Sequence, residues 1–163
     1  MDTQSEFWQD LKNGKFLSMV RESASGKQLS NSGEVYNIIK PLIAGHDDVE
    51  SMYCIFLDAE NKILAIERMF SGTITNATIY PRELVKSVIK HKASAVILTH
   101  NHPSGSKTPS AEDKTITIKL GISLASIDVT MHDHIIIGNG YFSMAEDGWL
   151  DKVSERFDAH LSV

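Results

Sequence analysis

The sequence has 163 residues, of which 42% are hydrophobic and 23% are charged, and this composition fits one globular domain and excludes a disordered or fibrous protein. Sixteen Lys and Arg against 21 Asp and Glu give a formal net charge of −5, so the broad basic surface that phosphate backbones require is absent overall. Cys54 is the single cysteine, which excludes a disulfide within one chain.

The N-terminal residues contain no cationic region followed by an apolar core, as a secretory signal would. Apolar stretches also fall short of the roughly 20 residues that a membrane-spanning helix needs. We therefore expect a soluble, cytoplasmic protein with no membrane partner. The sequence assigns no oligomeric state.

The first half of the sequence predicts a helix and a hairpin after an unreadable start. Residues 1–30 show no firm hydrophobic period, and we expect an N-terminal extension there, followed by one domain over 31–163. Apolar residues from 35 to 43 recur at three- and four-residue spacing, which predicts an amphipathic helix with a Ser or Asn cap that Pro41 should kink or end early. Compact apolar runs at 52–57 and 63–70 predict a β-hairpin.

The second half predicts further elements of both kinds. A helix should begin at Pro81, and the unbroken apolar run 95–99 is typical of a central strand buried on both faces. Residues 114–127 fit either strand alternation or a helical face, and the start signal at Ser110 favours a helix. The remaining predicted elements are a strand over 129–137, a turn at 138–140, a short strand over 141–144 and a helix over 150–161. The fold class is therefore mixed α/β.

A polar cluster follows the predicted central strand. Side chains alternate along a strand, so His100 and His102 project to the same side with Cα atoms roughly 6.5 Å apart and can converge on one ion. An open catalytic zinc site has three protein ligands and a water, and Asp113 could be the third ligand. Ser110 and Asp113 also match a capping box at a helix start. The two interpretations are compatible, because the helix dipole keeps a first-turn aspartate ionised.

The spacing His-x-His, seven residues, Ser, two residues, Asp resembles the JAMM motif of the MPN-plus metallopeptidases. Longer segments are similar to the RadC-type branch of that superfamily, and the resemblance covers roughly residues 30 to 147. These segments are His100-Asn101-His102-Pro103-Ser104-Gly105, Pro109-Ser110-x-x-Asp113, Asp133-His134-Ile135-Ile136-Ile137-Gly138 and Tyr80-Pro81-Arg82-Glu83.

The resemblance implies a JAB/MPN fold, which is α/β of the α+β type and cytidine-deaminase-like, with three layers and a curved mixed sheet flanked by helices. It implies a zinc ion held by His100, His102, Asp113 and a water. It also implies an upstream glutamate as general acid and base, and Glu50 matches best by position. Asp47, Asp48 and Glu67 remain alternatives to Glu50.

Further roles follow from the same resemblance. The Ser110 hydroxyl would donate to the oxyanion of a tetrahedral intermediate. Asp133 and His134 match the family pattern as support around the metal site, in the way that ligand histidines are commonly oriented by neighbouring groups, with direct ligation by His134 as the alternative. Three other histidines have no metal-ligand spacing and are expected on the surface, namely His46, His91 and His160.

The expected activity is zinc-dependent hydrolysis of peptide or isopeptide bonds in a peptide or protein substrate. Asn101 replaces the serine usual in deubiquitinating relatives, which argues against ubiquitin as substrate. Longer RadC proteins carry an N-terminal helix-hairpin-helix region, and we expect a short version without it. One alternative is a DNA-binding or DNA-repair role, against which the acidic charge argues, with a basic cluster only at Lys86, Lys90, His91 and Lys92. A catalytically silent MPN scaffold is the other alternative.

Overall fold

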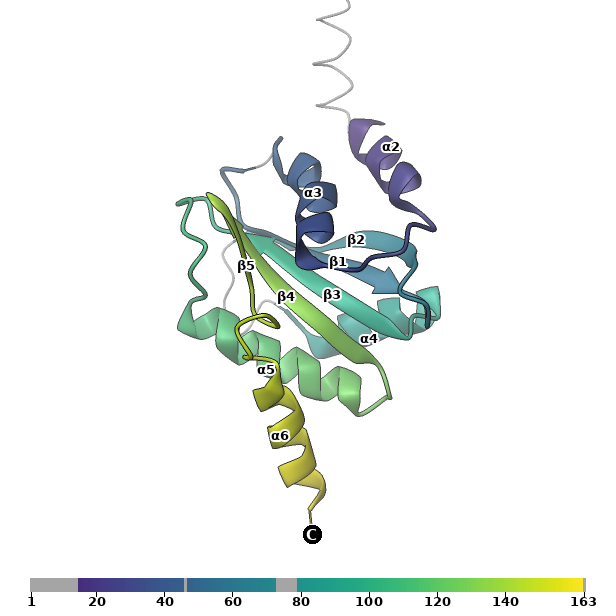
Figure 1. The fold of residues 1–163 in the computed structure, drawn as a ribbon, viewed down its shortest axis with the longest axis vertical. Coiled ribbons are helices and arrows are strands. Elements are labelled where there is room, and N and C mark those ends of the chain that lie inside the picture. Colours follow the sequence, from purple (N-terminus) through teal and green to yellow (C-terminus); the bar gives the residue numbers. More distant parts are fainter. Residues whose placement is uncertain (1–14, 46, 73–78, 163) are drawn as a thin grey trace, which may run out of the picture.

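The computed structural model describes residues 15–45, 47–72 and 79–162. Figure 1 shows the arrangement of the helices and strands. In chain order these elements are α2 (Lys15–Ala24), α3 (Ser32–Ile43), β1 (Ser51–Leu57), β2 (Ile63–Ser71), α4 (Pro81–His91), β3 (Ala95–Asn101), α5 (Ala111–Ala125), β4 (Thr130–Gly138), β5 (Gly140–Ser143) and α6 (Asp151–Leu161).

The strands form one mixed sheet with the order β2-β1-β3-β4-β5. Strands β3 and β4 are parallel and are connected through α5, whereas the other neighbouring strands are antiparallel. All seven residues of β3 are buried, as expected for a central strand covered on both faces. The mixed α/β class is confirmed, and the open sheet flanked by helices is consistent with a JAB/MPN fold.

Helices cover both faces of the sheet, which gives three layers (Figure 1). Alternation along β1 distributes its side chains between the two faces. Tyr53, Ile55 and Leu57 belong to the hydrophobic cluster under α2 and α3. Cys54 and Phe56 belong to the cluster under α4 and α5. Parity therefore assigns the residues of β3, and those of β4 from Asp133 onward, to a face, and this assignment positions the candidate site.

Most of the predicted elements are confirmed. The hairpin forms from β1 and β2, and the ambiguous segment after residue 110 is helical, as α5. The Ser110 side chain caps α5, and buried residues on one side of this helix, such as Ile116, Leu120 and Leu124, pack on the sheet. Tertiary packing therefore selected the helical period of this segment over its alternating one.

Two observations differ from the sequence expectations or add to them. Helix α2 lies in a region where no period was found. Helix α3 begins after the Asn31 cap and continues past Pro41 to Ile43, so this proline does not end it early. Burial of Leu42 and Ile43 under the sheet compensates for the hydrogen bond that proline removes, and the Tyr53 hydroxyl donates to the Leu42 carbonyl at 3.3 Å.

Membrane insertion through a helix finds no support in the described segments. Among residues 15–45, 47–72 and 79–162, every helix is too short or too polar to cross a bilayer.

Candidate metal centre

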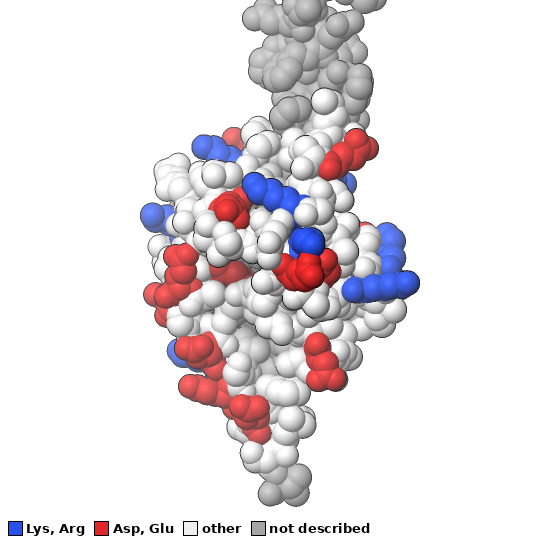
Figure 2. Space-filling model, turned by 45° about the vertical axis from the view of Figure 1, so that its right-hand side comes forward, with Lys and Arg blue, Asp and Glu red and all other residues white. Residues whose placement is uncertain are grey.

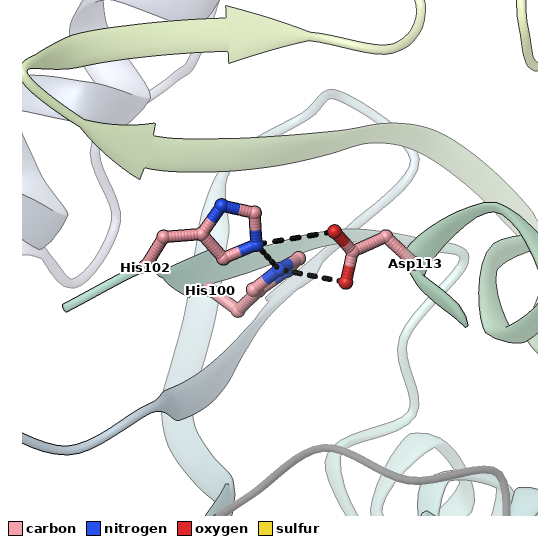
Figure 3. Close-up of side chains that lie close together, drawn as sticks. All are labelled: His100, His102 and Asp113. Carbon is pink, nitrogen blue, oxygen red and sulfur yellow. Dashed lines mark hydrogen bonds and ion pairs between the residues drawn. The ribbon is translucent and has the colours of Figure 1, made fainter. Parts of the chain in front are cut away.

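Three side chains converge where β3 meets the start of α5 (Figure 3). His100 is the last residue but one of β3, and His102 directly follows that strand. Asp113 lies in the first turn of α5. The Nε2 atoms of His100 and His102 are 3.0 Å apart. His100 Nε2 lies 3.0 Å from Asp113 Oδ1, and His102 Nε2 lies 3.1 Å from Asp113 Oδ2. The two Nε2 atoms thus lie next to each other and each contacts one carboxylate oxygen of Asp113, and we call this group of three side chains the ligand triangle.

The size of this triangle fits a divalent metal ion. At ligand distances of about 2.0–2.1 Å, a tetrahedral angle places two ligand atoms about 3.3–3.4 Å apart. The Nε2–Nε2 distance would lengthen by only a few tenths of an ångström to reach that geometry, and each carboxylate oxygen already lies 3.0–3.1 Å from one of the two histidines. Two imidazole nitrogens and one carboxylate oxygen are also a donor set that zinc accepts. The residues present therefore form a group able to hold a metal ion.

Asp113 is held in its ionised form. Burial alone would raise the pKa of its carboxyl group, but hydrogen bonds from His100 and His102 and from the Ser110 backbone outweigh burial and hold that pKa well below its usual range. Ser110 N–H donates to Asp113 Oδ2 at 2.7 Å, and Asp113 N–H donates to Ser110 Oγ at 3.0 Å. The capping box and the ligand position therefore coincide, as the sequence allowed.

A buried chain of hydrogen bonds orients His100. Its Nδ1 lies 2.8 Å from His134 Nε2, and His134 Nδ1 lies 2.6 Å from the Thr117 hydroxyl, which donates to the Asp113 carbonyl at 2.5 Å. Burial, followed by the charge of His100, lowers the pKa of His134 well below its usual value, so His134 is neutral.

Only one arrangement of protons satisfies all of these hydrogen bonds and leaves His100 Nε2 free to bind a metal. Because the Thr117 hydrogen is used on Asp113, His134 must donate from Nδ1 to Thr117. Nε2 of neutral His134 is then an acceptor, so His100 must donate from Nδ1. In this arrangement His100 Nε2 carries no proton, so a metal ion would take the place of the hydrogen bond from His100 to Asp113. This is the usual way in which a neighbouring group fixes the tautomer of a metal-binding histidine.

His102 is oriented by the loop between β3 and α5. Its Nδ1 donates to the Ser106 carbonyl at 2.9 Å, which leaves the Nε2 lone pair for a metal. This loop lies directly against Gly138, where an added Cβ atom would come within 2.3 Å of the Gly105 carbonyl oxygen. The hydrogen bond from Asn139 N–H to the Gly105 carbonyl, at 2.7 Å, holds the same contact.

The triangle opens into a groove of about 430 Å³. Its wall includes Glu50 and Ser110 together with His102 and Asp113. The negative charge of Glu50 is one of the influences that raise the pKa of His102, after the larger effect of Asp113. Glu50 therefore borders the same groove as these two ligands and acts on His102 through its charge. Because Ser110 Oγ is the acceptor in the helix cap, its own O–H can donate into the groove.

The alternatives to Glu50 lie elsewhere. Asp48 lines a neighbouring hollow of about 420 Å³, which also borders Glu50. Asp47 is exposed and is absent from the wall of either hollow. Glu67 on β2 contacts α4, where it accepts hydrogen bonds from Lys90 at 3.0 Å and His91 at 2.6 Å. Among these four candidate acids, Glu50 is the one that lines the same groove as His102, Ser110 and Asp113.

Asp133 and His134 separate, although they are adjacent in sequence. His134 faces α5 and contacts His100, whereas Asp133 points to the opposite face of the sheet. Asp133 there accepts hydrogen bonds from Ser143 Oγ at 2.5 Å and from Ala145 N–H at 2.9 Å. Burial raises the pKa of Asp133. The structure therefore brings only His134 to the ligand triangle.

The remaining histidines and the basic cluster lie away from the triangle. His160 is exposed as expected, and His46 lies outside the described residues. The expectation that His91 is a surface residue is wrong, because its side chain is only 18% exposed and packs on Phe56 as well as bonding to Glu67.

The predicted basic cluster is largely matched by carboxylates. Lys86 lies 3.3 Å from Glu83, and Lys90 pairs with Glu67 at 3.0 Å. On the face shown in Figure 2, Lys and Arg side chains occur in separate groups among Asp and Glu rather than in one continuous band. The described residues on this face therefore lack the positive stripe typical of nucleic-acid binding.

Sequence reasoning missed two residues that bear on the site. Thr117 lies four residues after Asp113, and this spacing places both side chains on one helix face, so the signal was available. Asn101 was noticed only as a departure from a motif. Its side chain accepts from Ser51 N–H at 2.8 Å and donates to the Val49 carbonyl at 2.9 Å, contacts that no local pattern indicates.

Comparison with known proteins agrees with this geometry. The sequence matches the RadC-like JAB domain over residues 29–149. It is 48% identical to a UPF0758 protein of Azotobacter vinelandii over 106 residues, which are 64% of this chain and 47% of the relative. It is 44% identical to a UPF0758 protein of Pseudomonas entomophila, over 82% of this chain and 58% of the relative. It is 40% identical to a UPF0758 protein of Thiobacillus denitrificans, over 82% of this chain and 59% of the relative. The chain thus spans about half to three fifths of the length of these curated relatives. With its match over residues 29–149 and these identities, the chain belongs to the RadC family of the JAB/MPN superfamily.

Proposed function

We propose that this protein is a zinc-dependent hydrolase of peptide or isopeptide bonds. His100, His102 and Asp113 are the proposed metal ligands, Glu50 is the proposed general base and Ser110 is the proposed oxyanion donor. The observation that carries the proposal is the convergence of three potential metal ligands, with contacts of 3.0–3.1 Å between them, beside an open groove. Two of these ligands line that groove together with Glu50 and Ser110.

A zinc ion held by these ligands would supply a Lewis acid that polarises a carbonyl and lowers the pKa of a coordinated water toward about 7. The chain itself contributes proton transfer and charge stabilisation. The Glu50 carboxylate takes a proton from the attacking water and later delivers it to the leaving amine. The Ser110 hydroxyl donates to the oxyanion that develops on the carbonyl carbon, and one such hydrogen bond is worth about 3–4 kcal/mol in other hydrolases.

The metal assignment is tested by the metal content of protein purified without a histidine tag. We expect close to one zinc ion per chain in the wild type and loss of that ion in His102→Ala. His160→Ala serves as the matched control, because His160 is exposed on α6. Equal metal content in wild type and His102→Ala would contradict the assignment.

The hydrolase assignment is tested by a screen for new peptide N-termini. Zinc-loaded wild type, Glu50→Gln and Glu155→Gln are each incubated with a peptide library and with proteins from a cell extract. We expect cleavage by the wild type and by Glu155→Gln, whose carboxylate is exposed on α6, and loss of cleavage in Glu50→Gln with zinc still bound. Cleavage at wild-type rate by Glu50→Gln would refute the role of Glu50, and no cleavage by any zinc-loaded form would refute the hydrolase proposal.

A further inference from the structure

Glu50 lies just before β1, outside the regular pairing of β1 with β3. The last pair of that ladder joins Met52 to His100, so regular strand pairing ends two residues after Glu50. A carboxylate used in proton transfer must be held in place, because a displacement of 1 Å can lower an enzymatic rate about 10²-fold. The question is which contacts hold the backbone of Glu50 next to the ligand triangle.

The Asn101 side chain continues the sheet where the β1–β3 ladder ends. Its Oδ1 accepts from Ser51 N–H at 2.8 Å, and its Nδ2 donates to the Val49 carbonyl at 2.9 Å. A carboxamide carries an acceptor and a donor side by side, as a backbone peptide does. Asn101 therefore bonds to the residues on both sides of Glu50, and it is only 3% exposed.

The other edge of this segment is held by β2. Gly72 N–H donates to the Glu50 carbonyl at 2.8 Å, next to the Ser51–Ser71 pair. The backbone around Glu50 is thus bonded toward β2 by Gly72 and toward β3 by Asn101. Met52, two residues on, faces α4 and α5 and pairs with His100, and the Glu50 side chain lines the groove beside His102 and Asp113.

From these contacts we infer that Asn101 is a positioning residue that sets Glu50 against the metal centre. This inference rests on the proposed function, because it takes Glu50 as the proton-transfer group. Asn101 lies between the two ligand histidines, so one strand end carries both ligands and the clamp that holds the base. A serine at this position would be one bond shorter and would carry its donor and its acceptor on one oxygen, so it would not place them side by side opposite Val49 and Ser51 as the carboxamide does. The residue between the ligands therefore controls the distance from base to metal.

The test uses cobalt-loaded protein, whose visible spectrum reports changes at the metal as the pH is varied. The variants are Glu50→Gln, Asn101→Ala and the double variant, each compared with wild type for cobalt dissociation constant and for the midpoint of the spectral pH titration. The control is Tyr53→Phe, which removes a buried hydrogen bond of β1 on the face away from the triangle. Asn101→Ser provides a milder replacement if Asn101→Ala does not fold.

We expect Glu50→Gln and Asn101→Ala to shift the midpoint in the same direction, with cobalt dissociation constants within about threefold of wild type. The double variant should shift no further than Glu50→Gln, because the two residues act through one group. A wild-type midpoint in Asn101→Ala, or additive shifts in the double variant, overturns the clamp alone. A wild-type midpoint in Glu50→Gln overturns the assignment of Glu50 and, with it, this inference.

Discussion

The tautomer chain behind His100 predicts that Thr117 controls metal affinity without touching the metal. Replacement by valine removes the hydroxyl that accepts from His134 Nδ1–H. The metal-free protein can then relax, because His134 can move its proton to Nε2 and donate to His100 Nδ1. That tautomer of His134 obliges His100 to carry its proton on Nε2, where a metal should bind.

The size of the effect follows from the cost of reversing this relaxation. Metal binding to Thr117→Val must restore the original tautomers and leave Nδ1–H of His134 buried without a partner, which costs about 1–3 kcal/mol. At 1.4 kcal/mol per factor of ten, zinc affinity should fall about 5- to 150-fold. The new methyl group also needs about 3.5 Å or more from His134 Nδ1, where the hydroxyl lies at 2.6 Å, so crowding adds to the loss.

The assay is competition for zinc with a coloured chelator, alongside urea unfolding of the metal-free protein. Thr117→Ala removes the hydroxyl without crowding and should weaken zinc binding as well, whereas Thr117→Ser should retain it. The matched control is Thr115→Val, because Thr115 on the same helix makes a similar bond to the Ala111 carbonyl but is exposed. Zinc affinity within about threefold of wild type in folded Thr117→Val and Thr117→Ala would refute the tautomer argument.

Three further outcomes follow from the structure. Gly138→Ala should weaken zinc binding and lower the melting temperature, because the added Cβ would lie 2.3 Å from the Gly105 carbonyl oxygen. The control is Gly45→Ala, because Gly45 has open space around it. Unchanged zinc affinity in Gly138→Ala would contradict the argument. Asp113 raises the pKa of His102, and a protonated histidine cannot bind metal. The zinc affinity measured by calorimetry should therefore be greatest above the pKa of His102 and fall about tenfold per pH unit below it. A zinc affinity that stays constant from pH 5 to 8 would contradict this. Burial raises the pKa of the Cys54 thiol well above its usual value, so a thiol reagent at pH 8 should modify Cys54 only after unfolding, and rapid reaction of the native protein would show that the core opens.

Elements that depend on local spacing were predictable from the sequence. Helix α3 and its cap, helix α5 and its capping box, and the hairpin of β1 and β2 each follow from residues within a few positions of one another. The spacing of His100, His102 and Asp113 also indicated that they would meet, because a strand end and the first turn of the following helix set their separation. The short range of these relations is the reason that they can be read from one sequence.

The residues that support the proposed metal ligands from behind were decided by the tertiary structure. Thr117, His134 and His100 come from α5, β4 and β3, and they meet only because β4 pairs in parallel with β3 beneath that helix. The side chains of Asp133 and His134 point to opposite faces of the sheet because side chains alternate along a strand. Only the strand register and the packing of the two faces decide which of them reaches the metal centre.

The position of Glu50 shows the same division between sequence and tertiary structure. By sequence it was one of several acids before and within the hairpin, and the groove wall together with the Asn101 clamp distinguishes it from the others. The sequence by itself therefore determined the local elements and the ligand spacing, because backbone geometry fixes distances over a few residues. Which distant side chains support those ligands depended on strand order and burial, because these arise only when the whole sheet packs between its helices.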